Sequence, residues 1–203
     1  MNKETKDFYE FAYKHRNGIE KQWTAGTANP ELVNLVYTNR IKAGSKILEV
    51  GCGLGTESIF LAVRGMQVTA MDLSENAINT GKEIAKQYEV DVDWIVGDLL
   101  ETDLFEQEFD VITDQGCFHH MKESEFKKYE EKIAKYLKPG GLFILRAFSD
   151  ALPPGEQPRR VSSDDMIETF HKNFKLEHLE RILSFSSEKY EKPMCWYSLW
   201  IKR

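Results

Sequence analysis

Long apolar runs are missing from this sequence. No uninterrupted apolar stretch approaches the roughly 20 residues that a membrane-spanning helix needs. The opening residues, MNKETKDFYE, also lack the apolar centre of a secretion signal. Both absences argue against a membrane partner and predict a cytoplasmic location.

Cysteine is scarce as well. Cys52, Cys117 and Cys195 are odd in number, widely spaced and without a CxxC pair. This spacing predicts neither a disulfide framework nor a zinc site, so we expect no metal centre.

An excess of positive charge is also lacking. The chain carries 27 Lys and Arg against 33 Asp and Glu, a formal net charge of −6. Surfaces that neutralise nucleic-acid phosphates are typically basic, so a small-molecule partner is favoured over nucleic acid. With 203 residues and 41% apolar content, the chain can bury one sizeable core. We therefore expect a single domain over residues 1–203, as a monomer or homodimer.

Short apolar segments alternate along the chain with longer segments of helical periodicity. β-branched and aromatic residues predict strands in KILEV (46–50), QVTAM (67–71), DVDWIV (91–96), FDVIT (109–113) and LFILRAF (142–148). Apolar residues three and four apart predict helices between most of these strands. The alternation predicts an α/β fold, a doubly wound and mostly parallel sheet with helices on both faces.

Capping residues mark the expected helix ends. Ser74 stands where it can cap the helix that follows the second strand, and Ser162 with Asp165 has the spacing of a capping box. The KPGG segment at 138–141 predicts the end of another helix.

Three glycines at alternate positions follow the first predicted strand, in EVGCGLG. Glycine loses more backbone freedom on folding than any other residue, so Gly51, Gly53 and Gly55 indicate a ligand that approaches the main chain closely. In doubly wound sheets ligands bind beyond the carboxyl ends of the strands, where this turn lies.

Acidic residues end the next two predicted strands. Asp72 comes 72 − 55 = 17 residues after the last glycine, close to where an acid binds the hydroxyls of a ribose. Asp98 is placed to accept a hydrogen bond from an adenine amino group, or to form an Asx turn. Together these residues predict an adenosine-containing cofactor. The glycine spacing is GxGxG, whereas a dinucleotide fingerprint would place its third glycine at Thr56.

Taken as a set, these motifs resemble those of class I S-adenosylmethionine-dependent methyltransferases. The segments found in that family's order are EVGCGLGTESIFLA, VTAMDLSENAI, VGDLLE, FDVITDQGCFHHM and YLKPGGLFIL. The resemblance implies a Rossmann-like sheet of seven strands whose last strand is antiparallel, with a final hairpin at 176–186 and 195–201. It also implies S-adenosyl-L-methionine as cofactor and S-adenosyl-L-homocysteine as product.

The same resemblance implies a set of cofactor-binding residues. The glycine loop would hold the methionine portion, Asp72 the ribose and Asp98 the adenine, while Glu49 would bind the cofactor amine through water or fix the loop. The full set comprises Glu49, Gly51, Cys52, Gly53, Gly55, Asp72, Leu73, Asp98, Leu99 and Gln115.

Candidate catalytic residues follow the fourth predicted strand. His119 and His120 are placed to face the transferred methyl group, and a histidine of near-neutral pKa can accept a proton from an acceptor. The alternative is that one histidine packs in the core and the other is solvated. A thiolate or other soft anion would need no base.

The acceptor pocket is expected between two flanking segments. Residues 1–40 would form a helical lid or a core-packing cap, with Trp23 shaping the cleft. Residues 148–161 form a loop insertion whose Arg159 and Arg160 would clamp an acceptor carboxylate or remain solvated. RAFSD and PRRVS, with DQGCFHHM, are similar to the thiopurine and thiol methyltransferase-like branch, which implies a thiol or another soft nucleophile as acceptor. The WD pair of the halide and thiol enzymes is lacking near Trp23.

Two other classes of function are considered. An NAD-linked oxidoreductase would use the same sheet and the same Asp72, but should carry the later glycine and a separate catalytic constellation. A non-catalytic regulatory module would bind the adenosine cofactor without methylating an acceptor.

Overall fold

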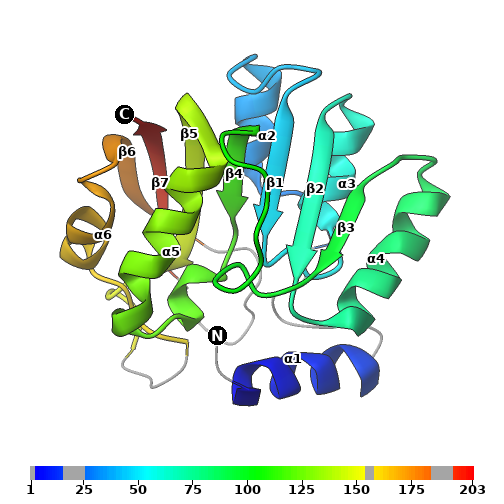
Figure 1. The fold of residues 1–203 in the computed structure, drawn as a ribbon, viewed down its shortest axis with the longest axis horizontal. Helices are drawn as coiled ribbons and strands as arrows, with labels where there is room; N and C mark the ends of the chain where they lie inside the picture. The colour runs from blue at the N-terminus through cyan, green and yellow to red at the C-terminus, as the bar shows by residue number, and fades with distance from the viewer. Residues whose placement is uncertain (1–2, 16–25, 154–157, 184–193) are drawn as a thin grey trace.

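The computed structural model describes residues 3–15, 26–153, 158–183 and 194–203 (Figure 1). The helices are α1 (Lys3–His15), α2 (Pro30–Tyr37), α3 (Thr56–Val63), α4 (Glu75–Gln87), α5 (Glu123–Tyr136) and α6 (Ser163–Phe170), with a 3₁₀ turn, η2, at Phe118–His120. The strands are β1 (Lys46–Val50), β2 (Gln67–Asp72), β3 (Asp93–Val96), β4 (Phe109–Asp114), β5 (Leu137–Phe148), β6 (Phe174–Leu183) and β7 (Met194–Lys202). None of the helices in these ranges is long and apolar enough to cross a membrane.

One seven-stranded sheet runs through the molecule in the order β3-β2-β1-β4-β5-β7-β6. The pairings from β3 across to β5 are parallel, whereas β7 runs antiparallel to both β5 and β6. The doubly wound, mostly parallel sheet with an antiparallel last strand is therefore confirmed. The strand order reverses between β1 and β4, which is where ligands bind in sheets of this kind.

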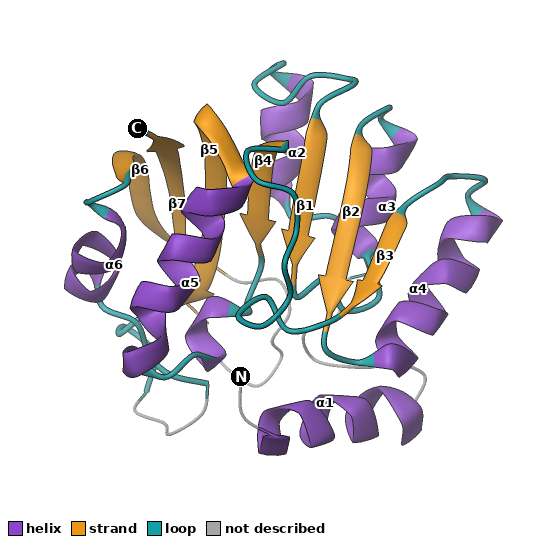
Figure 2. Ribbon diagram, viewed as in Figure 1, coloured by secondary structure: helices purple, strands orange, loops and turns teal. Residues whose placement is uncertain are grey.

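Helices cover both faces of the sheet (Figure 2). On one face α2 and α3 pack against the strands through an apolar cluster that includes Leu32, Leu61 and Ile144. On the other face α5 and α6 bury a larger cluster rich in aromatic rings, including Phe118, Tyr129, Phe143, Phe170 and Trp200. Burial of these side chains is the main favourable term that holds the layers together.

The expected helix caps form, and one strand is longer than predicted. The Ser74 hydroxyl accepts the Ala77 N–H at 3.1 Å, and Ser162 and Asp165 complete a capping box. α5 ends at Tyr136, before KPGG as expected, but β5 begins already at Leu137. It does so because Leu137 pairs with Phe109 before the register of β4 and β5 shifts. Residues 184–186 of the expected hairpin lie outside the described ranges.

Asp114 fastens the turn that follows β4. Its buried carboxylate accepts the backbone N–H groups of Gly116, Cys117 and Phe118 at 2.8, 2.6 and 2.9 Å. It also accepts the hydroxyl of Tyr129, from α5, at 2.6 Å. Burial raises the pKa of Asp114 to about 6 even though these four donors favour the charged form. The carboxylate thereby sets the path of the chain that leads to the two histidines.

This arrangement makes the contribution of Tyr129 depend on pH. Tyr129→Phe is expected to lower the free energy of unfolding at pH 7.5 by about 1.5–3 kcal/mol, the range for a hydrogen bond to a charged group. Losing a donor raises the folded-state pKa of Asp114 further. When the pKa of a group is higher in the folded than in the unfolded state, the group stabilises the protein at pH below its unfolded pKa, here 3.8. This stabilisation is lost as the pH rises through the folded-state pKa. The deficit should therefore shrink between pH 7.5 and pH 5 in urea unfolding.

Tyr136→Phe is the matched control for this prediction. Tyr136 is equally buried on the same helix, but its hydroxyl donates to the neutral carbonyl of Thr102 at 2.8 Å and accepts from the Lys132 ammonium at 3.1 Å. Lys132 stays protonated throughout this pH range, so the loss of this hydroxyl should cost the same free energy of unfolding, about 1–3 kcal/mol, at both pH values. A deficit for Tyr129→Phe that does not change with pH would contradict the assigned role of Asp114.

Candidate active site

The glycine loop connects β1 to α3 at the carboxyl end of the sheet. Gly51, Gly53 and Gly55 all have positive φ, at 69°, 54° and 72°. The N–H groups of Gly51 and Cys52 donate to the Met71 carbonyl at 2.8 and 3.0 Å, so the loop is tied to the neighbouring strand β2.

Side chains at the three glycine positions would collide with their surroundings. A Cβ on Gly51 would lie 2.8 Å from the Cys117 Cβ, and one on Gly55 would lie 2.3 Å from the Trp94 ring. A Cβ on Gly53 would lie 2.7 Å from the Tyr13 hydroxyl. Positive φ strains a side chain at all three positions, and at Gly51 the Cys117 Cβ also leaves no room for one.

Asp72 faces the glycine loop from the end of β2. One carboxylate oxygen accepts the Gly53 N–H at 2.8 Å and the other accepts the Ser74 N–H at 2.9 Å. Burial raises the pKa of Asp72, and these N–H donors oppose that rise. The structure thus brings together the expected acid and the expected loop.

The other expected cofactor residues occupy the same end of the sheet. Asp98 accepts the Leu100 N–H at 2.9 Å, so it forms the Asx turn considered above, and Leu99 beside it is buried. Leu73 is partly buried next to Asp72. Gln115 follows β4, where its side chain donates to the Thr113 hydroxyl at 2.8 Å.

Glu49 is enclosed beneath the loop. Only 1% of the residue is exposed, and its carboxylate accepts the Ser58 hydroxyl from α3. Burial, with the neighbouring Glu57 carboxylate next in importance, raises the pKa of Glu49. The contact with Ser58 joins β1 to the start of α3.

A buried polar network extends from Glu57 across the start of α2. The Asn29 amide donates to the Glu57 carboxylate at 2.6 Å and to the Gln115 side-chain oxygen at 3.1 Å. Asn29 accepts in turn from the Arg146 guanidinium. Sequence reasoning overlooked Asn29, Glu57 and Arg146 as site residues. One signal was present, because Arg146 is the only charge within the apolar run LFILRAF.

The two histidines lie beyond β4 and are poor bases. His119 Nδ1 accepts the Phe148 N–H at 3.1 Å, and its ring stacks on the Phe148 ring with centroids 4.5 Å apart. His120 Nε2 forms a hydrogen bond with the Tyr9 hydroxyl at 2.7 Å. Burial lowers the pKa of His119 well below its usual value and that of His120 to about 4. Both imidazoles are therefore neutral near pH 7.

α1 lies beyond the carboxyl ends of the parallel strands, below β1 and β2 in the view of Figure 1. Its Glu10 carboxylate accepts the Ser74 hydroxyl at 2.6 Å and the Asn76 amide at 2.5 Å, which fastens α1 to the start of α4. Tyr13 is buried next to Gly53. The adjoining stripe faces outward instead, since Phe8 and Phe11 are 57% and 65% exposed.

Of the residues expected to bind the acceptor, Arg159 and Arg160 are not placed together with the glycine loop as Asp72 is. Arg159 forms ion pairs with Glu123 and Asp165, both at 3.2 Å. The Arg160 guanidinium donates to the carbonyls of Pro153 and Pro158 and so braces its own loop. Trp23 lies outside the described residues.

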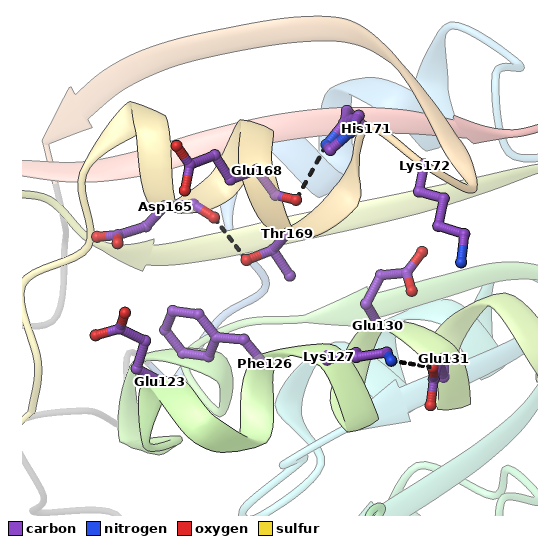
Figure 3. A pocket seen from close by; sticks show the side chains of 10 residues that line it. All are labelled: Glu123, Phe126, Lys127, Glu130, Glu131, Asp165, Glu168, Thr169, His171 and Lys172. Atoms are coloured by element: carbon purple, nitrogen blue, oxygen red, sulfur yellow. Dashed lines mark hydrogen bonds and ion pairs between the residues drawn. The ribbon is translucent and has the colours of Figure 1, made fainter.

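A separate surface groove lies between α5 and α6 (Figure 3). Mostly charged side chains line it, among them Glu123, Glu130, Glu168 and Lys172, and it includes no residue of the glycine loop. Within the described ranges, no group of three or more His, Cys, Asp or Glu residues is placed to hold a metal ion.

Comparison with known proteins points to one family. The family model described as a methyltransferase domain matches residues 47–141. Among curated proteins, the 2-heptyl-1-hydroxyquinolin-4(1H)-one methyltransferase of Mycobacteroides abscessus is 24% identical over 186 residues, covering 88% of this chain and 81% of its own length.

Two solved structures are similar over nearly the whole chain. A structure concerned with the conversion of a disulfide bond into a thioacetal group during echinomycin biosynthesis has a TM-score of 0.82 at 21% identity, covering 98% of this chain and 93% of that one. The 1,6-didemethyltoxoflavin-N1-methyltransferase of Burkholderia thailandensis, solved with 1,6-didemethyltoxoflavin and S-adenosylhomocysteine bound, has a TM-score of 0.77 at 20% identity and covers 98% and 87%.

The sheet order and the fold of these neighbours define a Rossmann-like methyltransferase domain. The matching family model and these relatives support an S-adenosylmethionine-dependent methyltransferase of class I, with S-adenosyl-L-methionine as its cofactor. None of these matches singles out the thiopurine and thiol branch.

The collisions at the glycine loop lead to a stability prediction. Gly51→Ala and Gly44→Ala both place a side chain at positive φ, but only Gly44 has open space around its Cβ position. Gly44→Ala should lower the free energy of unfolding by about 1–2 kcal/mol, the cost of the left-handed conformation. Gly51→Ala should cost about 1–3 kcal/mol more because the Cβ overpacks against Cys117. Urea unfolding measures both, and equal losses would contradict the crowding of the loop.

Proposed function

We propose that this enzyme transfers the methyl group of S-adenosyl-L-methionine to a small molecule through a thiol or another soft nucleophile. The observation that carries the choice of acceptor is the state of the two histidines. Both are buried and neutral with lowered pKa values, so the residues nearest the expected methyl group are weak bases. An acceptor that ionises readily by itself suits such a pocket.

The proposed cofactor position follows from the loop and the acids around it. The bare main chain of Gly51 and Gly53 would contact the methionine portion, and Asp72 would accept hydrogen bonds from the ribose hydroxyls. Asp98 and Leu99 would bind the adenine, and the chain at Gln115 would lie by the methionine amine. Asp72 would keep one contact with the loop and exchange the other for ribose, since each carboxylate oxygen accepts more than one hydrogen bond.

The hydrogen bond of His119 prevents it from acting as a base. Nδ1 accepts the Phe148 N–H, so the neutral ring carries its proton on Nε2 and has no free lone pair. His120 Nε2 is engaged by Tyr9. Proton transfer to a group with a pKa near 4 has little driving force. Both histidines are thereby assigned to shaping the pocket, with a thiolate as the attacking group.

The protein's contribution to the reaction is positioning and exclusion of water. The cofactor supplies an electrophilic methyl group on a sulfonium. The glycine loop and Asp72 would fix its orientation, and the acceptor would approach in line from the side of His119 and His120. α1, latched by Glu10 and packed over Gly53 through Tyr13, would act as the lid that keeps the pocket dry.

The relatives' names cover more than one acceptor atom. They include a hydroxyquinolone methyltransferase and an N1-methyltransferase, so they support a small-molecule acceptor. They do not specify which atom of the acceptor is methylated, so that choice is argued from the residues of the site. An NAD-linked oxidoreductase and a regulatory module gain no support from these matches. A cytoplasmic location, a lack of nucleic-acid partners and a monomeric or homodimeric state stay predictions from the sequence.

The ribose assignment is tested with Asp72→Asn. Removing the charged acceptor should weaken S-adenosylhomocysteine binding about ten- to hundredfold, because hydrogen bonds to a charged group contribute about 1.5–3 kcal/mol. Titration calorimetry measures the affinity. Asp103→Asn, an exposed acid paired with Lys132 and Lys135, is the control and should bind as wild type. Unchanged affinity in a folded Asp72→Asn variant would mean that Asp72 does not bind the ribose.

The acceptor class is tested with a panel of thiophenol, 4-methylphenol, aniline and benzoate, each incubated with S-adenosyl-L-methionine and analysed by mass spectrometry. Thiophenol should be methylated fastest. Replacing it with an alkyl thiol of higher pKa should move the rise of kcat/KM to higher pH, since ionisation of the acceptor controls the rate. Exclusive methylation of the phenol or the amine would refute the soft-nucleophile assignment.

The role of His120 is tested in the same assay. His120→Gln should retain kcat within about threefold, whereas loss of a general base costs about 10²–10⁴. His171→Gln, on an exposed helix end, is the control. A hundredfold loss confined to His120→Gln would restore the histidine as a base.

A further inference from the structure

Arg146 is a buried cation whose guanidinium is only partly used. The residue is 7% exposed, and Nη1 donates to the Asn29 side-chain oxygen. Nε and Nη2 are fully enclosed and have no hydrogen-bond partner among the described residues. Buried donors without partners are costly, and more so on a charged group.

The two unused nitrogens belong to one edge of the guanidinium. Nε and Nη2 point in nearly the same direction from the planar group, and this edge matches the two oxygens of a carboxylate. A single guanidinium nitrogen without a partner would indicate only loose packing. Here both nitrogens of one guanidinium edge lack a partner among the described residues, which is the arrangement that a pair of ligand oxygens would fit.

Arg146 lies at the level of the glycine loop. Its neighbour Leu145 pairs with Asp114, the last residue of β4. Asp114 also pairs with Val50, the last residue of β1. Arg146 is thus one step beyond the ends of both strands, on β5, which lies next to β4 at the point where the strand order reverses.

Electrostatic effects agree with this position. Arg146 acts on two groups from different elements: its charge opposes the burial that raises the pKa of Glu57, and it adds to the lowering of the pKa of His119. The contacts agree, since Asn29, which accepts from Arg146, donates both to Glu57 in α3 and to Gln115 in the turn after β4. Phe148, two residues further along β5, stacks on His119.

Glu57 does not use the open edge of Arg146. The Asn29 side chain stands between them, donating to the Glu57 carboxylate and accepting from Arg146 Nη1. The network satisfies Asn29 and holds the guanidinium in a fixed orientation. A counter-ion role for Glu57 alone would leave Nε and Nη2 unexplained.

We infer that Arg146 binds a carboxylate, or an equivalent pair of anionic oxygens, on the methyl acceptor, an inference that rests on the proposed function. The acceptor is then a small organic acid whose nucleophilic atom lies apart from its anionic group. Surrounding side chains must move for such a ligand to enter, because both nitrogens are enclosed in this structure.

Binding of a simple carboxylate tests the inference without turnover. Benzoate and its neutral isostere benzamide are titrated by calorimetry into the complex of the enzyme with S-adenosylhomocysteine. The wild type should bind benzoate at least tenfold more tightly. Arg146→Lys, which keeps the charge beside Glu57 but lacks the paired N–H edge, and Arg146→Met should both abolish this preference while S-adenosylhomocysteine affinity stays within about twofold.

Arg40→Gln is the matched control, because Arg40 is an exposed arginine that pairs with Glu177 at 2.7 Å. It should keep the benzoate preference. A wild type without preference, or an Arg146→Lys variant that retains it, would overturn the inference. Loss of S-adenosylhomocysteine affinity with unchanged benzoate binding would assign Arg146 to the cofactor's own carboxylate, which also overturns it.

Turnover separates this inference from the proposed function. 4-Mercaptobenzoate should be methylated with a higher kcat/KM than thiophenol, and Arg146→Lys should bring the two values together by raising KM for the acid. Benzoate binding that depends on Arg146, with no thiol methylated, would refute the soft-nucleophile acceptor and support the anion subsite. Methylation of both thiols at equal kcat/KM in the wild type would support the soft-nucleophile acceptor and refute the anion subsite.

Discussion

The backbone between β1 and α3 is the constraint on which the site depends. Gly51, Gly53 and Gly55 take positive φ values in a space already occupied by Cys117, Tyr13 and Trp94. The loop is held to β2 through the Met71 carbonyl and the Asp72 carboxylate. Gly51 is exposed and Gly53 is partly exposed, so these two residues present bare main chain, whereas Gly55 is buried against Trp94. We propose that S-adenosyl-L-methionine, the cofactor of this enzyme, binds here.

Buried carboxylates organise the rest of the crevice. Asp114 gathers three backbone N–H groups and a tyrosine hydroxyl, and so directs the turn after β4. Glu49 holds Ser58, and Glu57 holds Asn29. A buried carboxyl group is costly unless it is hydrogen-bonded, so these contacts fix geometry at the carboxyl end of the sheet while the apolar layers supply most of the stability. These fixed polar contacts suit methyl transfer, a reaction that depends on alignment of the acceptor with the methyl group.

Much of this architecture was predictable because its signals are local. The strand and helix order, the Ser74 cap and the capping box of Ser162 and Asp165 can be read within a few residues of each position. The early start of β5 was not predictable, since Leu137 joins the sheet through pairing with Phe109, far away in the chain. The outward orientation of Phe8 and Phe11 likewise depends on how α1 docks onto α4, which its own periodicity does not specify.

By itself the sequence determined the order of the elements, the glycine loop, and the acids Asp72 at the end of β2 and Asp98 just after β3, because each follows from adjacent residues and their spacing. Only the tertiary structure decided which distant side chains meet. Tyr9 and His120 are 111 residues apart in the chain, and Asn29 and Arg146 are 117 apart. Their contacts depend on strand register and on where helices dock, and these are set by packing of the whole core rather than by any local pattern.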